Sequence, residues 1–321
     1  MKLKRMIKTL FVLGLISVSV LCVSNMKASA AAWPLSGDVG SHDPTLARDG
    51  NTWWSPSTGK GLSMKYSNDG KVWHQGIQVF PKELSWWRKY APKMGDNDVW
   101  APDLQYYKGR YWMFYCVSEF GKNNSAIGLM SCTSVNKGDW RDDGMVISSK
   151  AGKDAYNAID PNLVIDKDGK PWLTFGSWFD GIHVVRLNQT TMKPTGTISS
   201  IANRSGGIEG ASMVYNNGYY YLFASIDKCC SGVNSTYKIA YGRSKSITGP
   251  FVDKNGVDMR KGGYSLLDTG NGRWKGPGGE YVYKNGNSWV IARHAYDANN
   301  NGAPTLLISD LYFDSKKWPI Y

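Results

Sequence analysis

Five acidic residues recur along the chain, each beside a glycine or a proline. They lie in the segments HDPT, WAPD, IDPN, IEGAS and GPGGE, as Asp43, Asp103, Asp160, Glu209 and Glu280. Successive acids are 60, 57, 49 and 71 residues apart. Two carboxyl groups on opposite sides of a glycosidic bond are what its hydrolysis requires. The spacing therefore indicates a repeated unit that presents one acid each time, and glycosidic hydrolysis is a chemistry that converging acids could perform.

Three of these acids share a closer pattern. Asp43, Asp160 and Glu209 each precede a proline or small residue and then a strand-like apolar step. If they converge, one can protonate the leaving oxygen and another can activate water or attack carbon. The third can raise the pKa of the acid by like-charge repulsion and orient it. Asp103 is expected to be structural and to accept backbone N–H groups of a neighbouring loop, whereas Glu280 has no assignable catalytic role.

Glycine-containing turns followed by aromatic residues come after the acids. The segments are ARDGNTWW (47–54), YYKGRYWMF (106–114), DKDGKPWLTF (166–175), YNNGYYYLF (215–223) and YKNGNSWVI (283–291). Asp-Gly and Asn-Gly favour the two-residue turns of β-hairpins, so each segment predicts a hairpin. A second turn follows each hairpin, in KYSNDGKVW, CTSVNKGDW, RLNQTTMKP, GRSKSITGPF and LYFDSKKWP. Each unit therefore has four strands.

Five four-stranded units in succession are typical of a β-propeller. The sequence predicts an all-β fold, a five-bladed β-propeller with four-stranded antiparallel blades, as one catalytic domain over residues 31–321. The first strand of each blade lies innermost, so the acids at its start would face the axis at one end. The proline after Asp43 is expected to hold the start of that strand extended. The alternative is an open β-sandwich whose turns are similar by chance.

Residues 1–30 have the pattern of a secretory signal peptide. A basic start, MKLKRMIK, precedes a short apolar core and the small-residue site Ala28-Ser29-Ala30. The apolar core is too short for a membrane span. The mature protein is therefore expected to be secreted and extracellular, with no membrane partner.

Charge and cysteine content restrict the function further. The leader carries five cations and no acids, so its removal lowers the formal net charge from +12 to +7. The remaining cations are scattered, which argues against nucleic acid as a partner and is compatible with weak attraction to an acidic polymer. Four cysteines remain, Cys116, Cys132, Cys229 and Cys230. Adjacent Cys229 and Cys230 are expected to be buried thiols, and a vicinal disulfide is the alternative.

Aromatic residues favour a sugar ligand. The chain has 14 Trp, 19 Tyr and 9 Phe. Aromatic faces pack on apolar surfaces while Trp N–H and Tyr O–H groups form hydrogen bonds, which suits sugar C–H faces and hydroxyls. Trp100 and Trp178 stand near the inner strand ends, although core packing is the alternative for any single Trp. His42 could orient Asp43 or face into the blade.

The segments HDPT, WAPD, NAIDPN, FGSW, IEGAS, KGPGG and RHAYD, in this order, resemble glycoside hydrolase family 43. Within it, the likeness is to secreted bacterial arabinan endo-1,5-α-L-arabinosidases and runs from about residue 33 to the C-terminus. The resemblance implies a five-bladed β-propeller that cleaves internal α-1,5-L-arabinofuranosidic bonds of arabinan, a side chain of plant cell-wall pectin, with inversion. It implies Asp43 as the general base, Glu209 as the general acid and Asp160 as the residue that modulates the pKa of the acid.

The resemblance also implies ligands. It implies substrate contacts from Trp100, Gly128, Asn157, Ile159, Ser177 and Trp178. It implies a metal ion, Ca²⁺, on the propeller axis near His294 and held largely through water, in a supporting rather than a reactive role. The expected partners are arabinan and arabino-oligosaccharides, and the expected state is a monomer.

Two alternatives remain open at this stage. An exo-acting α-L-arabinofuranosidase or β-xylosidase of the same family would share the carboxylates, but loops or an added domain would close its groove. The chain ends right after the fifth unit, which favours an open groove. A non-catalytic sugar-binding propeller would repeat its binding residues in every blade. The five units differ instead, which favours one central site.

Overall fold

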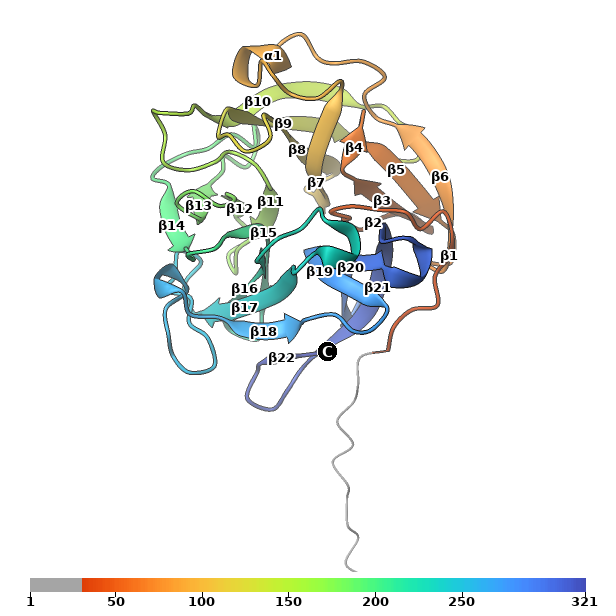
Figure 1. The fold of residues 1–321 in the computed structure, drawn as a ribbon. Helices are drawn as coiled ribbons and strands as arrows, with labels where there is room; N and C mark the ends of the chain where they lie inside the picture. The colour runs from red at the N-terminus through yellow and green to blue at the C-terminus, as the bar shows by residue number, and fades with distance from the viewer. Residues whose placement is uncertain (1–30) are drawn as a thin grey trace, which may run out of the picture.

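Five β-sheets surround a central axis in the computed structural model of the protein, which describes residues 31–321 (Figure 1). The segment with the signal-peptide pattern lies outside the described residues. Among those described, no helix is long and apolar enough to cross a membrane. The five-bladed propeller predicted from the repeat is confirmed.

The first two blades each contain five strands. Blade one has the order β1-β6-β5-β3-β2, with β2 (Ala47–Asp49), β3 (Thr52–Ser57), β5 (Ser63–Ser67), β6 (Val72–Gln78) and β1 (Ser36–Gly37). A short helix, α1 (Trp87–Tyr90), follows. Blade two has the order β10-β9-β8-β7-β4, with β7 (Asp98–Tyr107), β8 (Arg110–Ser118), β9 (Ser125–Cys132), β10 (Arg141–Ser149) and β4 (Gly59–Lys60).

The other three blades have four strands each, in sequence order. Blade three consists of β11 (Asn162–Ile165), β12 (Pro171–Phe175), β13 (Ile182–Arg186) and β14 (Ser199–Ala202). Blade four consists of β15 (Ile208–Asn216), β16 (Tyr219–Ile226), β17 (Lys238–Ser244) and β18 (Ser265–Asp268). Blade five consists of β19 (Trp274–Asn285), β20 (Ser288–Asp297), β21 (Ala303–Phe313) and β22 (Pro319–Ile320). Three 3₁₀ turns complete the chain: η1 (Gly232–Asn234), η2 (Met259–Lys261) and η3 (Ala298–Asn300).

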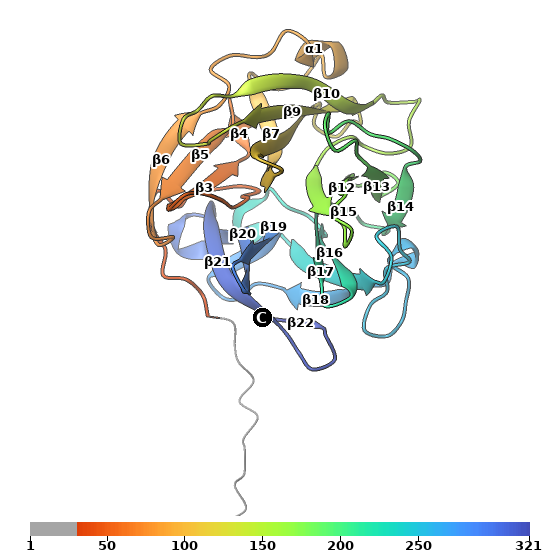
Figure 2. The same cartoon turned by 180° about the vertical axis from the view of Figure 1, so that it is seen from behind.

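All five predicted hairpins join the first and second strands of a blade, and all five later turns join the third and fourth. The extra strands β1 and β4 were not predicted, because two-residue pairings leave no periodic pattern. They join neighbouring blades: β4 from the first unit pairs with β7 of blade two. The N-terminal segment donates from Trp33 N to Ile308 O of β21, while β1 pairs with β6. This segment closes the ring between blades five and one (Figures 1 and 2).

Hydrophobic clusters lie between adjacent blades. Met64 of blade one packs in the same cluster as Met113 of blade two, and the other four pairs of neighbours are joined in the same way. Each fully buried apolar side chain contributes about 1.5–3 kcal/mol relative to leaving it exposed. The ring therefore holds the five inner strands in fixed positions around the axis.

A one-residue β-bulge occurs at the acid in three blades. A bulge changes the direction of the side chains next to it, so a bulge turns an acid toward the axis in each of blades two, four and five. In each case the inner strand advances three residues while the second strand advances two. The paired residues on either side of the bulge are Trp100↔Cys116 and Asp103↔Phe114 in blade two, Glu209↔Ser225 and Ser212↔Phe223 in blade four, and Gly278↔His294 and Tyr281↔Ala292 in blade five.

The two Asp-Pro steps have an unexpected backbone. Asp43 and Asp160 precede prolines, and the extended conformation expected for Asp43 is wrong. Their φ angles are 48° and 54°, in the left-handed region that non-glycine residues rarely adopt. Strained backbone of this kind concentrates at functional sites, where the surroundings enforce it. Both residues lie in the loop that leads into the inner strand of their blade, β2 or β11.

Candidate active site

A pocket of about 550 Å³ lies at the mouth of the axis where the inner strands begin. All five acids predicted to face the axis line it, together with Asp98. No Lys or Arg is among the residues that form its wall in the described chain. The structure thus brings Asp43, Asp160 and Glu209 together in one acidic pocket, as the repeat predicted.

Asp43 is held as an ionised carboxylate. Its Oδ2 lies 2.9 Å from His42 Nδ1 and accepts a hydrogen bond of 2.7 Å from Thr58 Oγ1. Burial favours the protonated acid, but the charge and hydrogen bond of His42, then His294 and Thr58, hold the pKa of Asp43 below its usual range. Its Oδ1 receives no hydrogen bond from the described residues. Asp43 therefore has one anchored oxygen and one that can take a proton.

The pKa of Glu209 is shifted in the opposite direction. Burial raises the pKa of Glu209 above its usual value, against the hydrogen bonds from Tyr237 and Ser177, and the Asp43 charge raises it further. Tyr237 Oη donates to Oε1 at 2.6 Å, and Ser177 Oγ donates to Oε2 at 2.7 Å. Hydroxyls can donate to a carboxylate or accept from a carboxylic acid. The same contacts can therefore hold Glu209 in both protonation states.

Asp160 is linked to Glu209 through the backbone. Its Oδ2 accepts the N–H of Gly210, the residue after Glu209, at 3.0 Å. Burial, followed by the charges of Glu209 and Asp43, raises the pKa of Asp160 well above its usual value. The pKa values of Asp160 and Glu209 are thus both raised, which favours retention of a proton in this part of the pocket.

The remaining two axial acids are fixed by neighbouring blades. Asp103 accepts Leu163 N at 2.7 Å and Asn162 Nδ2 at 3.0 Å, both from β11. Asp103 accepts a backbone N–H as expected, but from strand β11 and not from a loop. Glu280 Oε2 accepts from Ser225 Oγ at 2.7 Å. Burial raises the pKa of Asp103 to about 7 and that of Glu280 to about 8.

His294 is buried beneath Asp43. Its Nδ1 accepts the Asp43 backbone N–H at 3.1 Å and lies 3.6 Å from Asp43 Oδ1. Its ring stacks on His42 with the centroids 3.9 Å apart. Burial, then the His42 charge, lowers the pKa of His294 to about 3, while Asp43 raises the pKa of His42 against its burial. His294 is therefore neutral, and any positive charge of the pair resides on His42.

The six residues expected to contact substrate do not all lie at the pocket. Trp100 and Ile159 line the pocket, and Ser177 contacts the Glu209 carboxyl group directly. Trp178 is 38% exposed, and its ring packs so closely against Gly207 that a Cβ there would lie 2.6 Å from it. The structure does not bring Gly128 or Asn157 to the pocket wall. Gly128 packs against the Tyr115 ring inside blade two, and Asn157 accepts a hydrogen bond from Ser125 Oγ.

Several pocket residues were missed by the sequence analysis. Tyr237 and Thr58 hold the two key carboxyl groups, and Phe120, 85% exposed, stands beside Trp100 at the pocket wall. Thr58 Oγ1 also accepts the Ala101 N–H at 2.8 Å, which links blade one to blade two. None of these residues lies in a repeated motif, so the sequence carried no signal for them.

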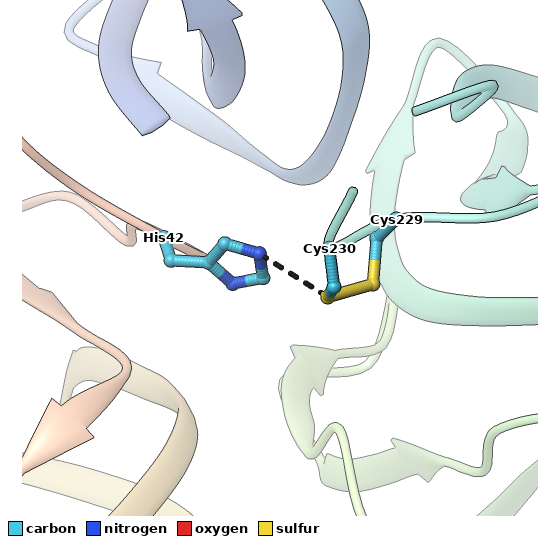
Figure 3. Close-up of side chains that lie close together, drawn as sticks. All are labelled: His42, Cys229 and Cys230. Carbon is cyan, nitrogen blue, oxygen red and sulfur yellow. Dashed lines mark hydrogen bonds between the residues drawn. A yellow bond between two sulfur atoms is a disulfide. The ribbon is translucent and has the colours of Figure 1, made fainter. Parts of the chain in front are cut away.

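Cys229 and Cys230 form a disulfide at the pocket wall, so the expectation of two buried thiols is wrong. The pair lies in the loop between β16 and β17, where Cys229 is half-buried and Cys230 is exposed. Among residues 31–321, Cys116 and Cys132 are free and buried. Figure 3 shows the disulfide facing His42, with Cys230 Sγ 3.7 Å from His42 Nε2.

A chain of hydrogen bonds joins this disulfide loop to Asp43. The Cys230 N–H donates to Tyr296 Oη at 2.7 Å, and Tyr296 Oη lies 3.1 Å from His42 Nε2. Because a backbone N–H can only donate, the Tyr296 hydroxyl proton is free to point at His42 Nε2. A neutral His42 then donates from Nδ1 to Asp43 Oδ2. The loop thus orients His42, and His42 orients Asp43.

Replacing Tyr296 by Phe is expected to lower kcat about tenfold with little change in KM, since a lost hydrogen bond of about 1–1.5 kcal/mol frees His42. Kinetics on linear arabino-oligosaccharides, with thermal unfolding alongside, would measure this. Tyr312→Phe is the matched control, because it removes an exposed hydroxyl that bonds Asp310 at 3.3 Å. An unchanged kcat for Tyr296→Phe would show that the chain of hydrogen bonds does not position Asp43.

A five-bladed propeller with buried carboxyl groups of opposed pKa shift at one mouth is the arrangement of a glycoside hydrolase. The pattern described as "Glycosyl hydrolases family 43" matches residues 37–319. The chain belongs to this family.

Relatives with known activity are similar over nearly their whole length. "Extracellular endo-alpha-(1->5)-L-arabinanase 1" of Bacillus subtilis is 51% identical over 313 residues, which cover 95% of both chains. "Extracellular exo-alpha-(1->5)-L-arabinofuranosidase ArbA" of Cellvibrio japonicus is 37% identical and is covered over 88% of its length. Among solved structures, the endo-arabinanase of Bacillus licheniformis has a TM-score of 0.86 and 53% identity, with 90% of this chain and 100% of that chain covered.

Proposed function

We propose that the protein is a secreted, inverting endo-arabinanase that cleaves internal α-1,5-L-arabinofuranosidic bonds of arabinan. The observation that carries the mechanism is the pair of opposed pKa shifts in one pocket: lowered at Asp43 and raised at Glu209. The names of the Bacillus relatives support the substrate and the endo action, and the name of the B. subtilis protein supports secretion. A relative of 38% identity has been solved with arabinohexaose, which supports an oligosaccharide ligand.

Glu209 is the general acid in this proposal. Its raised pKa favours retention of the proton, and Tyr237 and Ser177 keep the carboxyl group in place before and after transfer. The proton moves to the glycosidic oxygen as the bond to the anomeric carbon breaks. The leaving chain then departs as a neutral alcohol.

Asp43 is the general base. Its Oδ2 is anchored by His42 and Thr58, so Oδ1 is the atom that removes a proton from the attacking water. Water attacks the face opposite the leaving group, which inverts the anomeric centre. Inverting enzymes hold their two carboxyl groups about 6.5–9.5 Å apart to make room for this water. The same range is expected between Asp43 and Glu209.

Asp160→Asn is expected to move the alkaline limb of the kcat/KM profile to lower pH. The alkaline limb reports loss of the proton from the acid, and a neighbouring carboxyl group that can become charged resists that loss. Asparagine removes this resistance, so the pKa of Glu209 falls. A pH–rate profile from pH 4 to pH 9 would measure the shift, and an alkaline limb that stays in place or moves up would contradict the role of Asp160.

A hydrated Ca²⁺ ion on the axis fits the described residues. His294 Nε2 and Glu280 Oε1 are buried without a hydrogen-bond partner in residues 31–321, and His42, Asp43 and His294 place possible ligand atoms within 4.8 Å of one another. His294 Nδ1 accepts the Asp43 backbone N–H, so the ring proton is on Nε2, and His294 would hold the ion by donating that N–H to one of the waters around it. When bound, the ion would supply positive charge that favours the ionised form of Asp43.

Removal of the ion with EDTA is expected to lower Tm by about 5 °C, since a ligand at about 100 times its Kd contributes about 2.7 kcal/mol. Hydrolysis should fall as well, and added Ca²⁺ should restore both. His294→Ala is the control, because a variant without the ligand should show no response to EDTA. An identical EDTA response in wild type and His294→Ala would place the ion elsewhere.

The size of the first hydrolysis products distinguishes endo from exo action. The exo-acting Cellvibrio relative is itself covered over 88% of its length by this chain, so the extent of the similarity does not distinguish the two modes. A time course on linear, debranched arabinan should give a ladder of oligosaccharides before any monosaccharide. Proton NMR of the first products should show the β-anomer. Arabinose alone as the early product would favour the exo alternative, and an α-anomer would exclude inversion.

A further inference from the structure

The opposite mouth of the propeller axis forms a second pocket, of about 410 Å³. It lies where the inner strands end, at the hairpin turns between the first and second strands of each blade. Tyr281 lines both pockets, so it stands between them. The volume is within the range of small-ligand sites, about 300–1,000 Å³.

The two mouths differ in charge. The active-site pocket has six carboxyl groups and no Lys or Arg on its wall, whereas the second pocket has Arg48 and Lys284 and no Asp or Glu among the described residues that line it. All five axial acids line the first mouth, whereas the far ends of three inner strands place Arg48, Tyr215 and Lys284 at the second. We call the second pocket the basic mouth.

The wall of the basic mouth is rich in aromatic residues from three blades. Tyr106 and Tyr111 come from blade two, Tyr215 from blade four, and Tyr283 and Trp289 from blade five. Tyr106 is 60% exposed. The hydroxyls of Tyr106, Tyr215 and Tyr283 form no hydrogen bond with residues 31–321. These rings therefore present flat apolar faces and unused polar groups at one opening.

The two cations of the basic mouth are also without acidic partners. Arg48 and Lys284 are exposed, and neither forms an ion pair with a described residue. The Arg48 guanidinium carbon lies 5.0 Å from the centre of the Trp53 ring, and Lys284 Nζ lies 5.6 Å from that of Trp289. An aromatic partner fixes a cation without neutralising it. Both charges remain available to a ligand.

We propose that the basic mouth binds a carbohydrate that carries carboxylate groups, an oligomer of uronic acid. Aromatic faces stack on the C–H faces of sugar rings, and Tyr hydroxyls bond to sugar hydroxyls. Arg and Lys form charge-assisted hydrogen bonds with carboxylates, which a neutral sugar cannot accept in the same way. The net charge of +7 on the chain without its leader attracts a polyanion over a longer range. Such a site would retain the protein on an acidic polysaccharide while the acidic mouth remains open to a neutral one.

The test measures binding of hexagalacturonate to the mature protein by titration calorimetry and by the fluorescence of Trp289 and the other tryptophans. The variant is Arg48→Ser with Lys284→Ser. The control is Lys71→Ser with Lys245→Ser, which removes the same charge from exposed positions outside both pockets. The expected result is a Kd about tenfold weaker for the first variant, about threefold for each charged contact, and a Kd within twofold of wild type for the control. Tyr106→Ala should weaken binding without changing its dependence on salt.

The outcomes distinguish this site from the active site. Arg48→Ser/Lys284→Ser should hydrolyse linear arabinan as fast as wild type does. The binding of hexagalacturonate is measured separately from hydrolysis, so an error in the active-site assignment would not change the binding result. Equal weakening in both double variants would show a non-specific charge effect and overturn the proposal. No saturable binding of hexagalacturonate to wild type would overturn it too. Equally tight binding of neutral arabinohexaose at the basic mouth would show that carboxylates are not what it recognises.

Discussion

Glu209→Gln is expected to lower kcat on linear arabinan by about 10³-fold, within the range of about 10²–10⁴ for a lost general acid. The amide has nearly the same shape and can still bond with Tyr237 and Ser177, but it has no proton to give to the leaving oxygen. A substrate with a good leaving group, such as an aryl arabinofuranoside, needs little protonation. The loss on that substrate should therefore be much smaller, and a comparison of the two substrates would measure it.

Glu280→Gln is the matched control for this experiment. Glu280 is also a buried glutamate on the pocket wall, and burial raises its pKa to about 8. It is therefore already protonated near neutral pH, and the amide changes its charge little. We expect activity within a few-fold of wild type. If Glu280→Gln lost as much activity as Glu209→Gln, or if Glu209→Gln lost equally on both substrates, Glu209 would not be the acid.

Asp43→Asn is expected to cost about 10²–10⁴ in kcat on both types of substrate, because activation of water does not depend on the leaving group. The neutral amide cannot accept the water proton at the position of Oδ1. Azide needs no deprotonation, so it should restore the reaction of Asp43→Ala and yield the β-arabinofuranosyl azide. Kinetics with and without azide, with NMR of the product, would show this.

Asp98→Asn is the control for the loss of a negative charge from the same pocket. Asp98 lines the pocket and its Oδ2 accepts the indole Nε1–H of Trp100 at 2.7 Å, which asparagine can also do. Its activity should stay close to that of wild type. Azide rescue of Asp43→Ala that gave the α-azide would contradict inversion, and near-full activity of Asp43→Asn would remove Asp43 from the mechanism.

Patterns among residues close together in the sequence were sufficient to predict the fold. A hairpin turn such as the Asn217-Gly218 step depends on residues within a few positions, and its backbone requirement is visible in the residue types. Five repeats of that pattern with an acid ahead of each then define the propeller and the acids at its axis. The short strands β1 and β4 were not predictable, since each has two residues and pairs with a distant strand.

The same patterns were not sufficient to predict the details of the site. The residues around Cys229 and Cys230 did not distinguish two buried thiols from a vicinal disulfide, and the structure contains the disulfide. The φ angles of Asp43 and Asp160 contradict the usual effect of a following proline. The contacts around Asp43 fit its angle: His294 Nδ1 accepts the Asp43 N–H, and Gly279 leaves room for Asp43 Oδ1, which would lie 2.3 Å from a Cβ at that position.

The sequence by itself determined which residue types repeat, and hence the blade, the number of blades and the ring of acids at one end. Only the tertiary structure decided which of these acids have raised pKa values and that the pKa of Asp43 is lowered. The partners that set the pKa values of Asp43 and Glu209 come from other strands and loops: His294 is 251 positions from Asp43, and Tyr237 is 28 positions from Glu209. Closure of the ring brings these groups within hydrogen-bond distance, and burial then strengthens each interaction because little water remains to screen it. A hairpin is encoded by neighbouring residues, whereas a protonation state is set by contacts that exist only after the five blades have assembled.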